Sequence, residues 1–140
     1  MREGRCSCGA VRYTIDGPVR DVLVCHCGAC REATGGPWHA SAARRGDLLI
    51  ADEAALVWEP AAVSEHGASR GRCRACRTTV FWDAPGRDTV SFAVGTLEDP
   101  AGLELAGHIW VSGEGANLPA DGAPRHLEGR PASIEIPWRA

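Results

Sequence analysis

The sequence lacks lysine, and all fifteen of its basic residues are arginine. We attribute this to coding bias, so the missing lysine says little about function. Acidic residues outnumber basic ones and the net charge is −3, which argues against the basic face of a nucleic-acid-binding protein. The one basic cluster, which we interpret as a solvated surface rather than a phosphate site, comprises Arg70, Arg72, Arg74 and Arg77. We therefore expect no nucleic-acid partner.

Long apolar runs are also missing. No stretch is long enough to cross a bilayer, and the first residues lead into polar, cysteine-rich sequence instead of the apolar centre of a signal peptide. We therefore expect a cytoplasmic protein with no membrane partner. A reducing cytoplasm keeps thiols available for metal binding rather than for disulfides.

Helical periodicity is scarce, and short alternating segments take its place. Residues 11–15 alternate apolar and polar side chains before Gly17-Pro18, which predicts a half-buried strand and a turn. Residues 80–82 and 90–94 flank a Pro-Gly turn, a pattern typical of a hairpin. Further strands are expected over residues 22–24, 48–50, 56–58 and 108–111.

These segments predict one mainly β domain over residues 1–140, built of small folded sheets. One short helix is expected over residues 27–33, stopped by the Gly-Gly-Pro sequence that follows. Glycine and proline make the tail irregular from Ser112 onward. Ile134, Ile136 and Trp138 are expected to fasten this tail to the body.

Seven cysteines fall into three groups, and the outer two groups predict a metal site. Cys6 and Cys8 point to one side of an extended segment, so both sulfurs can reach the same ion. Cys73 and Cys76 have the two-residue spacing of a zinc knuckle. Four thiolates close a structural zinc site, whose binding energy of order 10 kcal/mol becomes folding energy. The alternative, redox-active or incidental buried thiols, does not explain paired spacing at two places.

The middle group differs because it has only three cysteines. Cys25 and Cys27 share a face and Cys30 follows one turn later, so they can hold one zinc and leave its fourth position open. Alternation directs His26 away from this face. The alternative is a second structural site, completed by one of the distant histidines His39, His66, His108 or His126.

The charge of the middle site indicates its chemistry. Zinc with three thiolates carries a formal charge of about −1, so it generates hydroxide poorly. Such a zinc is better suited to hold an incoming thiol as the nucleophilic thiolate. The site therefore favours carbon–sulfur chemistry over hydrolysis.

Six motifs occur in an order that resembles the glutathione-dependent formaldehyde-activating enzyme family, also called the centromere protein V family. The resemblance covers a core of about residues 4–125. The motifs are Gly4–Tyr13, Cys25–Arg31, Cys73–Cys76, Gly95–Leu97, His108–Val111 and Asp121–Arg125.

The resemblance implies a β-tent-like fold with two zinc ions per chain, one structural and one catalytic. It assigns Cys6, Cys8, Cys73 and Cys76 to the structural zinc, and the catalytic zinc to Cys25, Cys27 and Cys30. Arg77 departs from the pattern, because the family often has glycine there. Arg77 can still fit there if its backbone avoids a positive φ, so the departure bears on the shape of the loop rather than on the metal.

The family's named reaction joins glutathione to formaldehyde, giving S-(hydroxymethyl)glutathione. We therefore expect a zinc-dependent carbon–sulfur lyase that acts on glutathione or a related low-molecular-weight thiol and a small aldehyde. His39 or His108 could move the proton and Arg31 could meet a carboxylate, although a strand contact for His108 and a solvated Arg31 are the plainer interpretations. Trp38 and Trp110 either line a pocket or belong to the core.

Two other functions compete with this one. The first is a non-catalytic zinc-binding module that binds small thiols or a protein partner. The second is a methionine sulfoxide reductase-type enzyme, which would need a reactive cysteine outside the metal sites. The second is disfavoured because all seven cysteines are already assigned.

Overall fold

The computed structural model of the chain describes residues 1–26, 35–61, 67–111, 121–129 and 135–140. These residues form β-strands and three short 3₁₀ turns, η1 (Arg45–Asp47), η2 (Glu53–Ala55) and η3 (Val94–Thr96), so the expected mainly β fold is confirmed. The strands are β1 (Arg2–Arg5), β2 (Arg12–Ile15), β3 (Val19–Arg20), β4 (Val22–Cys25), β5 (Trp38–Arg44), β6 (Leu48–Ile50), β7 (Leu56–Pro60), β8 (Ser69–Cys73), β9 (Thr79–Asp83), β10 (Thr89–Ala93), β11 (Leu105–Ile109) and β12 (Trp138–Arg139).

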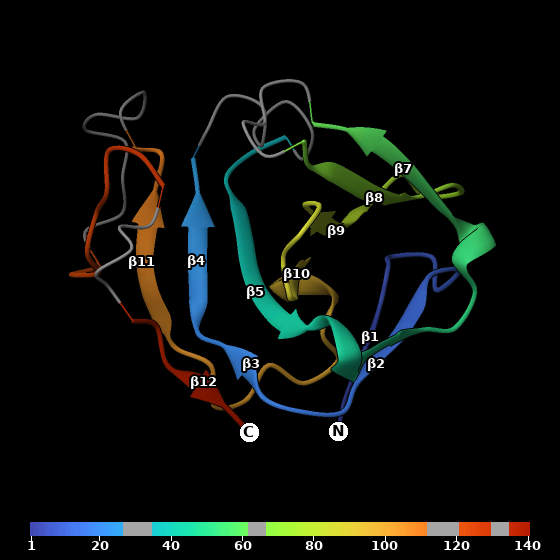
Figure 1. The fold of residues 1–140 in the computed structure, drawn as a ribbon, viewed down its shortest axis with the longest axis horizontal. Coiled ribbons are helices and arrows are strands. Elements are labelled where there is room, and N and C mark those ends of the chain that lie inside the picture. Colours follow the sequence, from blue (N-terminus) through green and yellow to red (C-terminus); the bar gives the residue numbers. More distant parts are fainter. Residues whose placement is uncertain (27–34, 62–66, 112–120, 130–134) are drawn as a thin grey trace.

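The strands form two sheets. A small antiparallel sheet has the order β1-β2-β6, and a large one runs β11-β4-β5-β10-β9-β8-β7, with β3 and β12 attached beside β5. The large sheet curls, so that β11 and β7 stand at opposite sides of the molecule in Figure 1. The expected β9–β10 hairpin is present and turns at Gly86, whose φ is 79°.

Two differences from the sequence prediction concern strands near the candidate site. β5 was not predicted, because its WHASAAR sequence is rich in alanine, which has little intrinsic preference for strands. It forms because β4 and β10 pair with its two edges. The strand expected over residues 108–111 begins and ends earlier, at Leu105 and Ile109, and Trp110 follows it with a φ of 55°. The helix expected over residues 27–33 lies outside the described residues.

The main core joins the two sheets through three aromatic rings. Tyr13 of the small sheet meets Phe81 and Phe92 of the large one, with ring centroids 5.2 and 5.9 Å apart. The Tyr13 hydroxyl lies 2.6 Å from that of Thr96, and a Cβ at Gly4 would overlap the Tyr13 ring. Cys6 and Cys73 belong to the same buried cluster, so the outer cysteine pairs sit at the edge of this core.

Strands β11, β4 and β5 divide their side chains between two faces. Cys25 pairs with Trp38 of β5 and Ile109 of β11, and these three side chains pack together. The next pairs along the sheet join Val24 to His39 and to His108. Because successive side chains of a strand point to opposite faces, Cys25 and the two histidines lie on opposite sides of the sheet.

Ile136 and Trp138 fasten the C-terminal residues to the large sheet, as expected. Trp138 pairs with Arg20 through β12, and Ile136 is buried. Ile134 lies outside the described residues. In the part of the chain that the structure describes, no helix is long and apolar enough to span a bilayer.

Candidate metal centre and adjoining cavity

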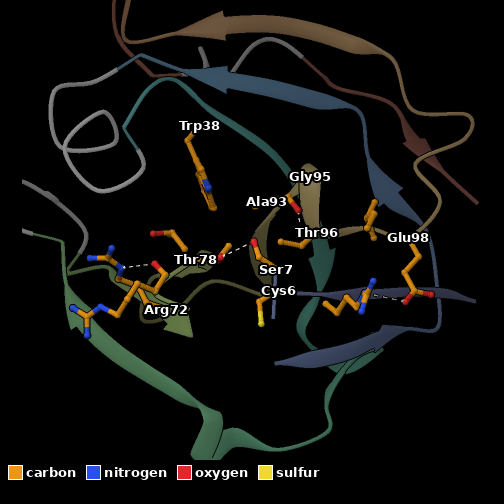
Figure 2. Close-up of a pocket in the computed structure, with 13 residues that line it drawn as sticks. Cys6, Ser7, Trp38, Arg72, Thr78, Ala93, Gly95, Thr96 and Glu98 are labelled. Carbon is orange, nitrogen blue, oxygen red and sulfur yellow. Dashed lines mark hydrogen bonds and ion pairs between the residues drawn. The ribbon is translucent and has the colours of Figure 1, made fainter. Parts of the chain in front are cut away.

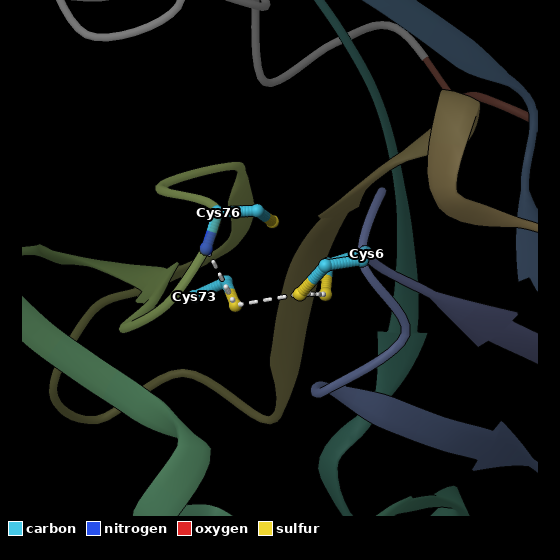
Figure 3. Close-up of side chains that lie close together, drawn as sticks. Cys6, Cys73 and Cys76 are labelled. Atoms are coloured by element: carbon cyan, nitrogen blue, oxygen red, sulfur yellow. Dashed lines mark hydrogen bonds between the residues drawn. The ribbon is translucent and has the colours of Figure 1, made fainter.

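Four cysteine sulfurs converge where two turns meet. Cys6 and Cys8 lie between β1 and β2, Cys73 ends β8, and Cys76 lies in the turn before β9. All four sulfurs lie within 4.8 Å of one another, and Figure 3 shows Cys6, Cys73 and Cys76 directed toward a common point. The predicted four-cysteine cluster, which could hold a metal ion, is therefore confirmed.

The sulfur spacing matches that of a tetrahedral metal site. The Cys8 sulfur is 3.6 Å from that of Cys6 and 3.7 Å from that of Cys73. Tetrahedral metal–sulfur bonds of about 2.3 Å place sulfurs about 3.8 Å apart. Backbone amides also stabilise negative charge on two of the sulfurs. Val11 N–H donates to the Cys6 sulfur at 3.3 Å, and Cys76 N–H donates to the Cys73 sulfur at 3.4 Å.

The thiols of this cluster differ in acidity. Burial opposes ionisation of Cys76, but hydrogen bonds from the side chain and backbone of Thr78 outweigh it and lower the pKa of Cys76 to about 5. A backbone hydrogen bond from Ala10 favours the Cys8 thiolate, yet the neighbouring Cys6 and desolvation raise the pKa of Cys8 to about 11. Adjacent thiolates repel one another, so the four cannot all ionise unless a cation neutralises them. The cluster therefore fits a divalent metal.

Arg77, in the knuckle turn, does not avoid a positive φ. Its φ is 69°, in the left-handed region that it was expected to avoid. The turn requires this conformation, because Arg77 N–H donates to the Cys73 carbonyl at 3.0 Å while Cys73 N–H donates to the Thr78 carbonyl at 2.9 Å. The Arg77 side chain is 61% exposed and lies 3.8 Å from Glu59.

The middle cysteine group is described only at its first member. Cys25 ends β4, is buried, and packs against Trp38 and Ala40. Cys27, Cys30, Arg31 and His66 lie outside the described residues, so the three-cysteine site stays a prediction.

The histidines near Cys25 form a separate polar group. His26 is buried and its Nε2 lies 2.8 Å from Nδ1 of His108, whose Nε2 lies 2.8 Å from Oδ2 of Asp121. His26, His39 and His108 line a cavity of about 400 Å³ on the face opposite Cys25. Strand alternation therefore directs His26 away from Cys25 as predicted. Strand alternation also places His39 and His108 on the face opposite Cys25. Neither histidine can therefore complete a metal site at Cys25 or move a proton there.

A larger cavity, of about 930 Å³, lies on the Cys25 side of the sheet. Trp38, which packs against Cys25, forms one wall, and Cys6 of the four-cysteine cluster forms another (Figure 2). Trp38 is thus both packed in an apolar cluster and exposed to a cavity, whereas Trp110 does not line it. The remaining lining residues are Arg5, Ser7, Arg72, Arg77, Thr78, Thr79, Ala93, Gly95, Thr96, Leu97 and Glu98.

Comparison with known families identifies the chain. The family model described as glutathione-dependent formaldehyde-activating enzyme matches residues 1–113. The chain belongs to this family. Its fold is similar to that of a Rhodobacter sphaeroides protein of known crystal structure, with a TM-score of 0.57 and 23% identity, over 74% of this chain and 98% of that one. Among the curated proteins no match is found.

The match to the glutathione-dependent formaldehyde-activating enzymes includes both cysteine regions and the large cavity. The Gly95–Leu97 motif, which sequence analysis left without a role, lines that cavity. Ser7, Thr78 and Thr79 could not be predicted from the sequence, because no spacing pattern marks them. They reach the cavity only because β1 and β9 meet at the cysteine cluster, where the Ser7 and Thr78 hydroxyls lie 3.1 Å apart.

Proposed function

We propose that this protein joins a low-molecular-weight thiol to a small aldehyde, as its family's description suggests for glutathione and formaldehyde. The sulfur bonds to the carbonyl carbon and the thiol proton ends on the carbonyl oxygen, giving S-(hydroxymethyl)glutathione for that pair. The observation that carries the proposal is the position of Cys25, packed against the Trp38 wall of a cavity of about 930 Å³. The protein is then a carbon–sulfur lyase that works among the reduced thiols of the cytoplasm.

Two zinc ions per chain belong to this proposal. Cys6, Cys8, Cys73 and Cys76 would hold the first as a structural ion, since their sulfur spacing fits tetrahedral zinc. Cys25, Cys27 and Cys30 would hold the second. Zinc bound there would supply a Lewis acid that lowers the pKa of a substrate thiol at neutral pH.

The residues around Cys25 keep water away from its side chain and hold its segment in place. Trp38 is 8% exposed and, with Ala40 and Ile109, keeps water from the Cys25 side chain. The backbone amide of His26 donates to the Ile109 carbonyl at 3.0 Å, which holds the segment that carries Cys25 against β11. The proposed reaction thus takes place at a wall from which water is excluded, next to an open, polar cavity.

A second candidate function is a thiol-binding module without catalysis. One observation favours it: among the described residues that line the cavity there is no histidine, and Glu98 is the one carboxylate. Glu98 is half exposed and lies 3.8 Å from Arg5, so it is a poor proton acceptor for a buried thiol.

Two measurements on the cobalt-substituted full chain separate these functions. Under the enzyme proposal, a small thiol shifts the cobalt absorption bands, and ¹³C-formaldehyde with glutathione forms the adduct faster than without protein. A spectral shift with no rate enhancement would establish the binding module. If no thiol shifts the spectrum, both proposals are wrong. Cys25→Ser is expected to abolish the shift. Cys8→Ser is the corresponding substitution in the four-cysteine cluster.

A further inference from the structure

Three side chains outside the large cavity form a chain of hydrogen bonds that ends next to Cys25. Oδ2 of Asp121 lies 2.8 Å from Nε2 of His108, and Nδ1 of His108 lies 2.8 Å from Nε2 of His26. His108 is 2% exposed and His26 is 5% exposed, whereas the side chain of Asp121 is 27% exposed. The chain of hydrogen bonds therefore runs from the surface into the interior, and it ends at the residue that follows Cys25.

Backbone hydrogen bonds hold the elements that carry these side chains. β11 pairs in parallel with β4, beside it in the large sheet (Figure 1). The amide of His108 donates to the Pro124 carbonyl at 2.8 Å, and the amide of His26 donates to the Ile109 carbonyl at 3.0 Å. Three segments that are far apart in the sequence thus meet at His108, namely the end of β4, β11 and the turn at Asp121.

The carboxylate gives the chain of hydrogen bonds a direction. Oδ1 of Asp121 accepts from Ala123 N–H at 2.9 Å, which turns Oδ2 toward His108. Hydrogen bonds from the Ala123 amide and the His108 side chain lower the pKa of Asp121, so its carboxylate is ionised and can only accept. Nε2 of His108 therefore carries the proton, and Nδ1 of the neutral ring accepts from Nε2–H of His26.

This direction determines what His26 presents on its other nitrogen. With the proton on Nε2, Nδ1 of His26 has a lone pair and accepts hydrogen bonds. Nδ1 of His26 is buried, so it faces protein groups rather than water. A carboxylate two rings away thus makes this buried nitrogen, in the residue between Cys25 and Cys27, an acceptor and not a donor.

We propose that Asp121 and His108 are positioning residues for the segment that carries Cys25, because they fix the orientation and the tautomer of His26. Strand alternation places the histidines on the face opposite Cys25, so they act through the backbone and not by contact with the thiol. The assignment rests on the proposed function, since it explains how the thiol-binding segment is held in place.

The test substitution is Asp121→Asn, which keeps the shape of the side chain. Its Oδ1 retains the hydrogen bond from Ala123, so an NH₂ group replaces Oδ2 and donates to His108. Nε2 of His108 then has to accept, and the whole chain of hydrogen bonds reverses. In ¹⁵N NMR of the zinc-loaded full chain at pH 8, above the ordinary histidine pKa of about 6.5, both histidines are expected as Nε2–H tautomers in the wild type and as Nδ1–H tautomers in the variant.

Two further measurements follow the Cys25 segment itself. The His26 amide is expected to exchange its hydrogen about tenfold faster in Asp121→Asn, because a neutral amide replaces the carboxylate and Nδ1 of His26 becomes a donor. The glutathione concentration that half-saturates the shift of the cobalt spectrum is expected to rise about tenfold, as is typical when an outer hydrogen-bond partner of a metal site is lost. Far-UV circular dichroism confirms that the variant is folded.

Asp99→Asn is the matched control. Oδ1 of Asp99 accepts from Ala101 N–H at 3.0 Å, so this residue makes the same turn that Asp121 makes with Ala123. Asp99 is exposed, and within the described ranges no hydrogen bond joins its side chain to a histidine. Asp99→Asn is expected to leave both tautomers, the amide exchange and the thiol response unchanged.

The assignment is overturned if the wild-type rings are not Nε2–H tautomers or if Asp121→Asn does not reverse them. It is also overturned if the tautomers reverse while the His26 amide exchange or the thiol response stays as in the wild type. If no thiol shifts the wild-type cobalt spectrum but the tautomers and the amide exchange respond to Asp121→Asn, the proposed function fails and the positioning role stands. If the spectrum shifts but neither the tautomers nor the exchange respond, the positioning role alone fails.

Discussion

At the scale of single residues, Arg77 shows how the metal turn constrains the backbone. A left-handed φ brings the Cβ of a non-glycine residue close to the following carbonyl, which costs about 1–2 kcal/mol. Arg77 nevertheless has a φ of 69°, because the two hydrogen bonds of the Cys73 turn fix it. Its exposed side chain offers little compensation through a pair 3.8 Å from Glu59.

Arg77→Gly is therefore expected to stabilise the protein, and Arg77→Ala is not. Both variants remove the same side chain contacts, but only glycine relieves the strain at a φ of 69°. The free energy of unfolding of the zinc-loaded protein, from urea titration, should be about 1 kcal/mol higher for glycine than for alanine. Equal values for the two variants would show that the turn is not strained.

At the scale of elements, the buried Asp21 carboxylate anchors β12 to the rest of the large sheet. Asp21 accepts hydrogen bonds from Arg139 of β12 at 2.7–3.2 Å and from the Glu104 amide at 3.1 Å, and its side chain is 3% exposed. The hydrogen bonds from Arg139 are the main reason that the pKa of Asp21 lies below its usual value, although burial opposes them. Asp21 lies between β3 and β4, and its carboxylate thus joins this part of the chain to β12 and to the segment before β11.

Asp21→Asn is expected to destabilise the protein by about 1–2 kcal/mol at pH 7, because it weakens charge-assisted hydrogen bonds. A lowered folded-state pKa gives stability above the unfolded-state pKa of about 3.9 and loses it as pH falls through the lower value. The difference between wild type and Asp21→Asn should therefore shrink below about pH 5. Urea midpoints of both proteins at several pH values measure this, and taking the difference cancels metal release common to both. A gap that stays constant down to about pH 3 would contradict it.

The elements also show how far the sequence determines the fold and the site. Alternation at residues 11–15 and the Pro-Gly turn near Gly86 suffice to predict β2 and the β9–β10 hairpin, because both signals are local. The four-cysteine cluster is predictable for the same reason, since each cysteine pair carries its own spacing. β5 is not predictable, because partners on both edges stabilise its alanine-rich sequence. Thr79 reaches the cavity because β1 and β9 meet at the cysteine cluster, so no local pattern identifies it.

At the scale of the whole molecule, the four-cysteine cluster joins segments that are far apart in the sequence. Cys8 and Cys73 are 65 residues apart, yet their sulfurs lie 3.7 Å apart. The cluster connects the small sheet to the β8–β9 end of the large sheet, beside the core formed by Tyr13 and Phe81. The described part of the segment that carries Cys25 instead lies within the large sheet, where β5 and β11 hold it.

This difference predicts unequal effects for two cysteine substitutions. Cys73→Ser removes a buried ligand from the link between the sheets, so most of the metal's folding energy, of order 10 kcal/mol, is lost and the chain unfolds. Cys27→Ser is expected to leave the fold intact and to lower the bound zinc from two ions to one. Circular dichroism and elemental analysis of the purified variants measure both effects. If Cys27→Ser unfolds the chain as fully as Cys73→Ser, the middle cysteines are structural too, and the carbon–sulfur chemistry proposed for them has to be abandoned.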